Sequence, residues 1–314
     1  MKITIANQSA EVTFILLGFS EYPQLQLPLF LVFLTIYTVT VLRNLGMILI
    51  IKSSSRLCTP MYFFLSHLSF VDFCYSTVVT PKLLENLIDR TISFSGCIAQ
   101  FCFACLFGVA ETFMLAAMAY DRFLAVCSPL LYAAAMSPKR CALLVAGSYS
   151  WGVTCSMTLT CFLLALSYCK SSTINNFICD HSVIVSVSCS DPSITQMLCS
   201  IIAIFNEASS LVIILMSYMF IFITVMGMPS ASGRWKTFST CASHLTAISI
   251  FHGTILFLFC IPNPKTSWLT VKVTSVFYTV LIPMLNPLIY SLRNKEVKNT
   301  FTRLLFTKPL CHST

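Results

Sequence analysis

The chain carries very little charge. Only 10% of its 314 residues are Asp, Glu, Lys or Arg, whereas about a quarter is usual in soluble domains, and 57% are hydrophobic. The sequence also has no long low-complexity segment and no evident internal repeat. These absences exclude a soluble globular domain, and they give no support to a transporter built from inverted repeats.

Catalytic motifs are lacking as well. We find no Ser-His-Asp set, no HExxH motif and no phosphate-binding loop, so we predict that the chain is not an enzyme. Cys102 and Cys105 form a CxxC pair, but it lies in an apolar segment without a matching second pair, and we expect no metal site there. No cleavable signal peptide is evident, because Lys2 precedes polar residues and the apolar run at 12–19 is short.

The sequence does contain long apolar runs, each able to cross a membrane as a helix. The seven candidate spans are 25–51, 58–81, 97–120, 141–166, 199–226, 238–260 and 270–292. We therefore predict an all-α membrane protein: a seven-transmembrane helix bundle over 25–292, with an N-terminal segment at 1–24 and a tail at 293–314. In the tail, Val297, Phe301, Leu304 and Leu305 recur at helical spacing beside basic residues, which predicts a short amphipathic helix at the membrane surface.

The charged residues that give the net charge of +8 are distributed unevenly between the predicted loops. With the N-terminus outside, the cytosolic segments hold two acidic residues, Asp121 and Glu296, whereas the outer face has six basic and seven acidic residues. The cytosolic basic residues are Lys52, Arg56, Arg122, Lys139, Arg140, Arg234, Lys236, Arg293, Lys295, Lys298, Arg303 and Lys308. This asymmetry predicts an extracellular N-terminus and a cytosolic C-terminus, and it favours the lipid bilayer over nucleic acid as the partner of the positive charge.

An Asp-Arg pair stands where the third span should leave the bilayer. Asp121 and Arg122 follow the apolar run 97–120. A local ion pair there could open when neighbouring helices move, so that a distant ligand could bias it. The plainer alternative is that Arg122 is a topology anchor, one more cytosolic cation.

Three ionisable residues lie deep within the spans. Asp72 and Glu111 reach similar depths on the second and third spans, about 16 to 18 Å from the cytosolic side at 1.5 Å per residue. Such carboxyl groups must share a cation, a proton or a buried water, so we predict either a sodium or proton site or a hydrogen-bonded packing pair. Arg43, beside Asn44, lies about 13 Å deep by the same rise and must snorkel or find a partner.

The outer loops carry the remaining chemical signals. Cys97, Cys169, Cys179 and Cys189 lie outside the spans, and this even number on an oxidising face favours two disulfide bonds, with three possible connectivities. Asn7 begins the one glycosylation sequon on the outer face.

Five motifs occur in order along the chain: PMYFFLSHLSFVD (60–72), MAYDRFLAVC (118–127), Ser217-Tyr218, FSTCASHL (238–245) and PMLNPLIYSLRNKEV (283–297). Together they resemble the olfactory receptor family of rhodopsin-like G-protein-coupled receptors, in its tetrapod-type class. The resemblance covers residues 7 to 303. The chain departs from the family pattern at Arg43, where a Gly is usual, and at Phe123, where a Tyr is usual.

The resemblance implies roles for particular residues. Arg122 would meet the G protein, with Asp121 as its resting partner. Tyr218, His244 and Tyr290 would rearrange around it, and Asp72 and Glu111 match the family's buried acidic pair. The implied disulfides are Cys97–Cys179, which would hold the second outer loop over the bundle as a lid, and Cys169–Cys189 within that loop.

The resemblance also implies a binding pocket between the outer halves of spans 3, 5, 6 and 7. Helical spacing then selects its lining: Phe101, Ala104, Cys105, Gly108, Ile202, Asn206, His252, Ile255, Phe259 and Thr279. This lining is apolar with few polar groups and no Lys or Arg, so we expect a small, neutral, mostly apolar volatile odorant and not a carboxylate.

The implied partners are that odorant, a stimulatory olfactory-type heterotrimeric G protein that raises cAMP, and trafficking chaperones. Cofactors are not expected, apart from a possible sodium ion. A transporter or channel is the alternative from another class, but it would need a polar stripe through several spans, and only Asp72, Glu111 and Arg43 lie deep. A non-signalling member of the family also remains open.

Overall fold

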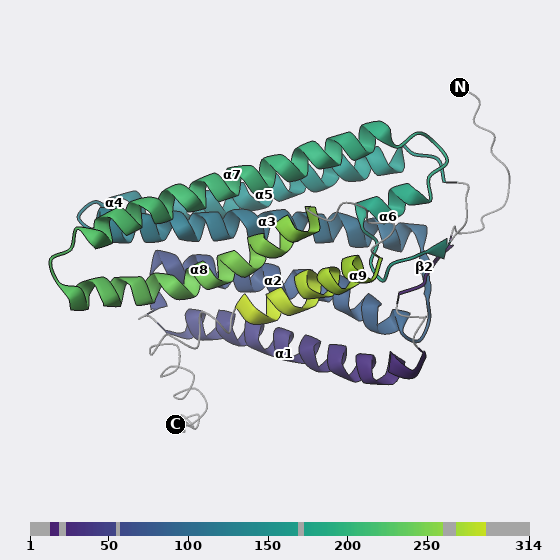
Figure 1. Cartoon of the computed structure of the whole chain (residues 1–314), viewed down its shortest axis with the longest axis horizontal. Helices are drawn as coiled ribbons and strands as arrows, with labels where there is room; N and C mark the ends of the chain where they lie inside the picture. The colour runs from purple at the N-terminus through teal and green to yellow at the C-terminus, as the bar shows by residue number, and fades with distance from the viewer. Residues whose placement is uncertain (1–12, 19–22, 55–56, 169–172, 260–267, 287–314) are drawn as a thin grey trace, which may run out of the picture.

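The computed structural model describes residues 13–18, 23–54, 57–168, 173–259 and 268–286. Seven long helical segments in this part of the chain lie alongside one another in an elongated bundle (Figure 1). Six are α1 (Gln26–Ser53), α2 (Pro60–Asn86), α3 (Phe94–Cys127), α5 (Pro138–Leu164), α7 (Ser193–Met226) and α8 (Ala231–Phe259). The seventh begins as α9 (Trp268–Val276), continues through the π-helical η3 (Phe277–Leu281) and ends in helical residues 282–286.

Several of these helices suit a bilayer by their own length and composition. Among the described residues, α1, α2, α3 and α7 are long and apolar enough to cross a membrane, and α8 joins them if its two halves, bent by 43°, count as one span. α5 is long enough, but its Ser, Thr and Gly residues make it less apolar. Two of these small residues, Gly152 and Ser156, contact α3, as described below.

Several helices extend beyond the predicted spans, including α2, which ends at Asn86, and α8, which begins at Ala231. α3 continues to Cys127, so Asp121 and Arg122 lie within a helix and not at its exit. α7 begins at Ser193, before the apolar run itself starts. Hydrophobicity marks where a helix meets lipid, whereas backbone hydrogen bonding extends the helix into the polar regions on either side.

One end of the bundle is closed by elements that the sequence did not predict. A small sheet has the order β2-β1-β3, with β1 (Thr13–Leu16) antiparallel to β2 (Thr91–Ser93) and parallel to β3 (Thr173–Ile174). In β1, Phe14 and Leu16 are buried while Thr13 and Ile15 are exposed, the period-two pattern of a strand that covers a core. The short helix α6 (His181–Ser186) lies beside this sheet, and we call this end the lid end (Figure 1).

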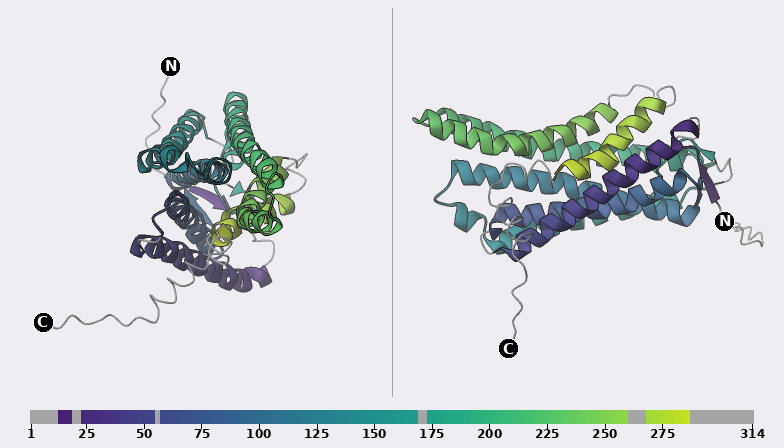
Figure 2. Two further views of the ribbon diagram at one scale, coloured as in Figure 1. Left: turned by 90° about the vertical axis from the view of Figure 1, so that its left-hand side faces the viewer. Right: turned by 90° about the horizontal axis from the view of Figure 1, so that it is seen from below.

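The opposite end carries α4 (Tyr132–Ala135), one turn between α3 and α5 (Figure 1). We call it the α4 end. The views of Figure 2, along and across the bundle, show the helices gathered around a common centre. The largest fully enclosed side chains there are apolar: Phe64, Leu68, Met114, Leu115, Met118 and Phe251.

Small side chains let α5 approach α3 closely. A Cβ atom at Gly152 would lie 2.7 Å from the Leu106 carbonyl oxygen, so a larger residue there would push the two backbones apart. One turn further on, the Ser156 hydroxyl donates a 2.5 Å hydrogen bond to the Cys102 carbonyl. Close backbone contact and interhelical hydrogen bonds replace the hydrophobic driving force that is missing between helices in lipid.

The last helix widens where Pro283 follows. Proline lacks the N–H that would bond to the carbonyl of Thr279, and its ring crowds that carbonyl in regular α-geometry. The chain relieves this conflict in the π-helical turn η3, just before the proline. The carbonyl of Pro283 in turn lacks a helical donor, because residue 287 is also a proline, and it accepts a 3.1 Å bond from Asn44 Nδ2 on α1.

Candidate functional site

Mid-bundle, the carboxyl groups of Asp72 and Glu111 meet through one amide. Asn286 Nδ2 lies 3.2 Å from each oxygen of Asp72 and 2.9 Å from Glu111 Oε1. Asp72 and Glu111 are 0% and 1% exposed. The amide nitrogen of Asn286 thus serves the carboxyl groups, whereas that of Asn44 bonds to the backbone at Pro283.

This cluster lacks a cation among the described residues. Arg43 is exposed on the flank of α1, while its neighbour Asn44 is fully buried. Two buried carboxyl groups with a single amide between them cannot both stay ionised without a counter-charge, so the site requires a proton or a small cation. The geometry is compatible with both.

At the α4 end, the predicted pairing of Asp121 with Arg122 is wrong. No ion pair joins them within the described ranges; Asp121 Oδ1 instead accepts a 2.8 Å hydrogen bond from the Tyr132 hydroxyl of α4. Arg122 Nη2 contacts the Met61 sulfur, and its Nε is buried without a hydrogen-bond partner. Adjacent residues on a helix point about 100° apart, so each side chain finds its partner on a different neighbouring element.

Two of the predicted switch residues do meet. The Tyr218 hydroxyl on α7 hydrogen-bonds to His244 Nδ1 on α8. The structure therefore links α7 and α8 at the α4 end through polar groups. Tyr290, the third predicted partner, lies outside the described residues, as do Asn7, Cys169 and the tail 293–314.

At the lid end, the structure forms a partly open cavity of about 330 Å³ between α3, α7, α8, the last helix and the lid. It lies near the lower limit of ordinary ligand sites, which favours a small molecule. Its walls are mainly apolar. They are formed by Tyr75, Phe101, Ala104, Cys105, Gly108, Val109, Thr112, Leu159, Asn176, Ile178, Cys179, Asp180, His181, Cys199, Ile202, Ala203, Asn206, Glu207, Ile255, Ser275, Tyr278 and Thr279.

Most of the residues predicted from helical spacing line this cavity. Those brought together there are Phe101, Ala104, Cys105, Gly108, Ile202, Asn206, Ile255 and Thr279. His252 is buried but does not line it, and the side chain of Phe259 lies outside the described part. Asn206 is also less available than expected, because its Oδ1 accepts a 2.7 Å bond from the Trp151 indole of α5.

Glu207 is the most important residue that the sequence analysis missed. It is 7% exposed, lines the cavity, and its Oε1 lies 2.9 Å from His252 Nδ1. The charge count above assigned this carboxylate to the outer face, whereas it lies inside α7. A carboxylate within an apolar span is the same signal that singled out Asp72 and Glu111, and it could have revealed Glu207.

The lid is held over the cavity by covalent and polar links. A disulfide joins Cys97, at the start of α3, to Cys179, and Cys189 is also disulfide-bonded. Gln100 Oε1 accepts a 3.0 Å bond from the Cys179 backbone, and its Nε2 donates to the Val78 carbonyl of α2. The chain after Cys179 is thereby brought into the cavity wall.

Asp180 and His181 enter the cavity wall because they follow this tether. His181 is 7% exposed, packs against the Phe101 ring, and has a buried Nε2 without a hydrogen-bond partner. Burial lowers the pKa of His181, which the adjacent Asp180 partly offsets. The imidazole is therefore neutral at neutral pH, and its Nε2 can donate a hydrogen bond to a ligand or accept one from it, depending on the tautomer.

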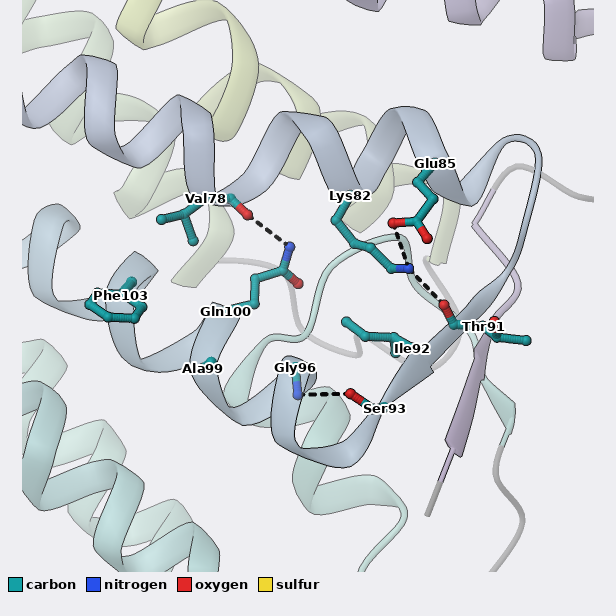
Figure 3. A pocket seen from close by; sticks show the side chains of 10 residues that line it. All are labelled: Val78, Lys82, Glu85, Thr91, Ile92, Ser93, Gly96, Ala99, Gln100 and Phe103. Atoms are coloured by element: carbon teal, nitrogen blue, oxygen red, sulfur yellow. Dashed lines mark hydrogen bonds and ion pairs between the residues drawn. The ribbon is translucent and has the colours of Figure 1, made fainter. Parts of the chain in front are cut away.

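A second hollow, of about 500 Å³, lies on the outside of α2, β2 and α3 (Figure 3). Lys82 crosses it, with Nζ 2.9 Å from Glu85 Oε2 and 2.6 Å from the Thr91 carbonyl (Figure 3). The lysine charge is thus already occupied, and its contacts fasten β2 to α2. This hollow supports the lid end and is separate from the cavity under the lid.

Comparison with known proteins matches this architecture to a class of membrane receptor. Residues 33–308 match the profile of the family described as Olfactory receptor. Olfactory receptor 5D13 of Homo sapiens is 74% identical over 308 residues, 98% of both chains. Olfactory receptor 1165 of Mus musculus is 62% identical over the full length of both chains, and Olfactory receptor 5D18 of Homo sapiens is 63% identical over 98% and 99% of the two chains.

The chain belongs to the olfactory receptor family of G-protein-coupled receptors. This membership confirms the predicted seven-helix membrane bundle and the prediction that the chain is not an enzyme. It is a multi-pass membrane protein that senses odorants and acts through a G protein.

Proposed function

We propose that the receptor binds small, mostly apolar volatile molecules in the cavity under the lid and activates a stimulatory olfactory-type G protein, which raises cAMP. The observation that supports this most directly is the small, largely apolar cavity at the lid end, opposite the polar contacts of Arg122, Tyr218 and His244. Both features lie on α3, α7 and α8, so a ligand that shifts these helices acts on both ends.

The proposal also includes an orientation of the receptor in the membrane. We place the lid end and the N-terminus outside the cell and the α4 end in the cytosol of the plasma membrane, because basic residues gather at the latter. Asn7 is then available for glycosylation, and the disulfides form in an oxidising compartment. We also propose that trafficking chaperones assist the receptor, since Arg43 lies on the exposed flank of a span.

The test is an odorant panel applied to cells that display the full chain, with cAMP as the readout. We expect a dose-dependent rise that disappears in cells lacking stimulatory G-protein α subunits and returns when the olfactory-type subunit is added. A response that persists without those subunits would contradict the proposed coupling.

The carboxyl pair is a second candidate site, for sodium or a proton. The support is the enclosed contact of Asp72, Glu111 and Asn286, which requires a counter-charge. If sodium binds, replacing NaCl with choline chloride should lower the unfolding temperature of the purified receptor, and Asp72→Asn should remove that difference. An identical response to sodium in the variant would place any sodium elsewhere.

A further inference from the structure

The outward oxygen of Glu207 is the starting point. Glu207 Oε1 lies 2.9 Å from His252 Nδ1, whereas Oε2 accepts no hydrogen bond from the described residues. The described residues do not fully enclose Oε2, so this oxygen remains accessible. Glu207 itself lines the cavity. The cavity wall therefore presents one half of a carboxyl group whose other half is occupied.

The protonation of the pair leaves Oε2 as a hydrogen-bond acceptor. The bond between Oε1 and Nδ1 contains one proton, which belongs either to the imidazole or to Oε1. Oε2 carries no hydrogen when the carboxyl group is ionised or when the shared proton is on Oε1, and in both of these forms it is a hydrogen-bond acceptor.

The other polar side chains that the helices contribute are largely committed to internal bonds. Thr112 and Thr279 donate to the carbonyls one turn before them, at 2.9 and 2.7 Å, and Asn206 is engaged by Trp151. In the lid, both oxygens of Asp180 accept bonds from residues 181 and 182. His181 Nε2, in the lid, has no hydrogen-bond partner among the described residues. Among the side chains that the helices contribute, Glu207 Oε2 is the acceptor best placed to choose between ligands.

We propose that the cavity selects small apolar molecules that carry a hydroxyl group, with Glu207 Oε2 accepting the hydroxyl hydrogen and His252 acting as the positioning residue. A ketone, ester or ether of the same shape offers only acceptor oxygens, which Oε2 repels and leaves unsatisfied. The inference rests on the proposed odorant-binding function of this cavity and narrows its ligand class to alcohols and phenols.

The test measures binding without a G protein. The full-length receptor is purified into nanodiscs, and the ligand-induced rise in its unfolding temperature is titrated with short primary alcohols and with ethers of equal heavy-atom number. We expect an affinity about tenfold higher for each alcohol than for its matched ether, the effect of one net hydrogen bond. Equal affinities, or no stabilisation by any alcohol, would overturn the proposal.

Variants then assign the preference to the pair. Glu207→Leu should bring the alcohol-to-ether ratio to about one while ethers still bind, and Glu207→Gln should lower the ratio, because its amide can turn to donate. His252→Gln, which still donates to Glu207, should keep the ratio, whereas His252→Leu should reduce it. Glu85→Gln, at the exposed outer hollow, is the matched control and should change nothing.

An unchanged ratio in Glu207→Leu would remove this residue from selectivity. If that variant does not fold, as its unfolding curve would reveal, the near-isosteric Glu207→Gln decides the question. The cAMP assay is run in parallel. Selective stabilisation by alcohols without a cAMP response would contradict the proposed coupling and leave the hydroxyl preference standing. A cAMP response equal for alcohols and ethers would support the coupling and contradict the hydroxyl preference.

Discussion

The two ends of the bundle are held together in different ways. At the lid end, a disulfide, a three-stranded sheet and the bridging bonds of Gln100 connect segments far apart in the chain. At the α4 end, the described contacts of the switch residues are single polar links: Tyr132 to Asp121, Arg122 to Met61 and Tyr218 to His244. The lid end thus keeps its shape, while the α4 end can exchange partners at low cost.

The largest effect should come from removing the cation of the weakly held end. We expect Arg122→Ala to abolish ligand-stimulated cAMP while surface protein stays near the wild-type level, because Arg122 has no ion-pair partner among the described residues whose loss would unfold the helix. The measurement is cAMP per surface receptor. Lys139→Ala, an exposed cation at the same end, is the control, and a fully responsive Arg122→Ala would remove Arg122 from the switch.

Removing the Cys97–Cys179 disulfide should weaken the lid end. Cys179→Ser is expected to cost about 2–5 kcal/mol, the usual range for a native disulfide, and to cause retention in the endoplasmic reticulum. Surface labelling and the unfolding temperature of the solubilised receptor measure this. Cys161→Ser, a free and exposed cysteine of α5, should traffic normally. Normal trafficking of Cys179→Ser as well would mean that the sheet and Gln100 hold the lid without the bond.

Arg43 belongs to neither end, and its removal should help the chain. A mid-span arginine costs about 2.5–3.5 kcal/mol on insertion scales, whereas a helical Gly costs about 1 kcal/mol. We therefore expect Arg43→Gly to raise surface expression, and Arg43→Lys, which keeps the charge, to leave it unchanged. An antibody assay on intact cells decides; unchanged or lower expression of the Gly variant would show that Arg43 is satisfied where it lies. A rise in basal cAMP per receptor would instead indicate that Arg43 holds the resting state.

The smallest expected effect is at α4. Tyr132→Phe removes the hydroxyl that bonds to Asp121, a loss of about 1 kcal/mol, and should raise basal cAMP up to about fivefold if this link belongs to the resting state. Tyr149→Phe is a suitable control, since the Tyr149 hydroxyl is buried without a hydrogen-bond partner. Equal basal activity in the two variants would show that Asp121 does not need its partner at rest.

The sequence predicted where the long helices lie, but it predicted only some of the contacts between their side chains. Residues expensive to bury must meet something, so the depths of Asp72 and Glu111 were enough to predict that they share a site, and the structure places one amide between them. The Asp121 pairing was wrong because it assumed that neighbours in sequence pair with each other, whereas Tyr132 lies nearer once α4 folds back.

The faces of α7 were the hardest to assign. In lipid, both the bundle side and the outer side of a span are apolar, so hydrophobic periodicity does not tell them apart. We chose Asn206 as the polar residue of the cavity from its spacing to Ile202, and Trp151 on α5 holds its oxygen. Only the packing of α5 and α8 around α7 reveals that Glu207 faces His252.

The π-helical turn at Phe277–Leu281 sets the rotational phase of the last helix. One extra residue in a turn rotates everything beyond it by about 100° relative to an unbroken α-helix. Tyr278 and Thr279 line the cavity from within this turn, whereas Asn286 faces the carboxyl pair beyond it. Deleting Val280, which follows both cavity residues, would restore the regular repeat and turn Asn286 away from Asp72. The last helix therefore consists of two half-helices, one facing the cavity and one facing the carboxyl pair. The π-helical turn between them sets how far one half is rotated about the helix axis relative to the other.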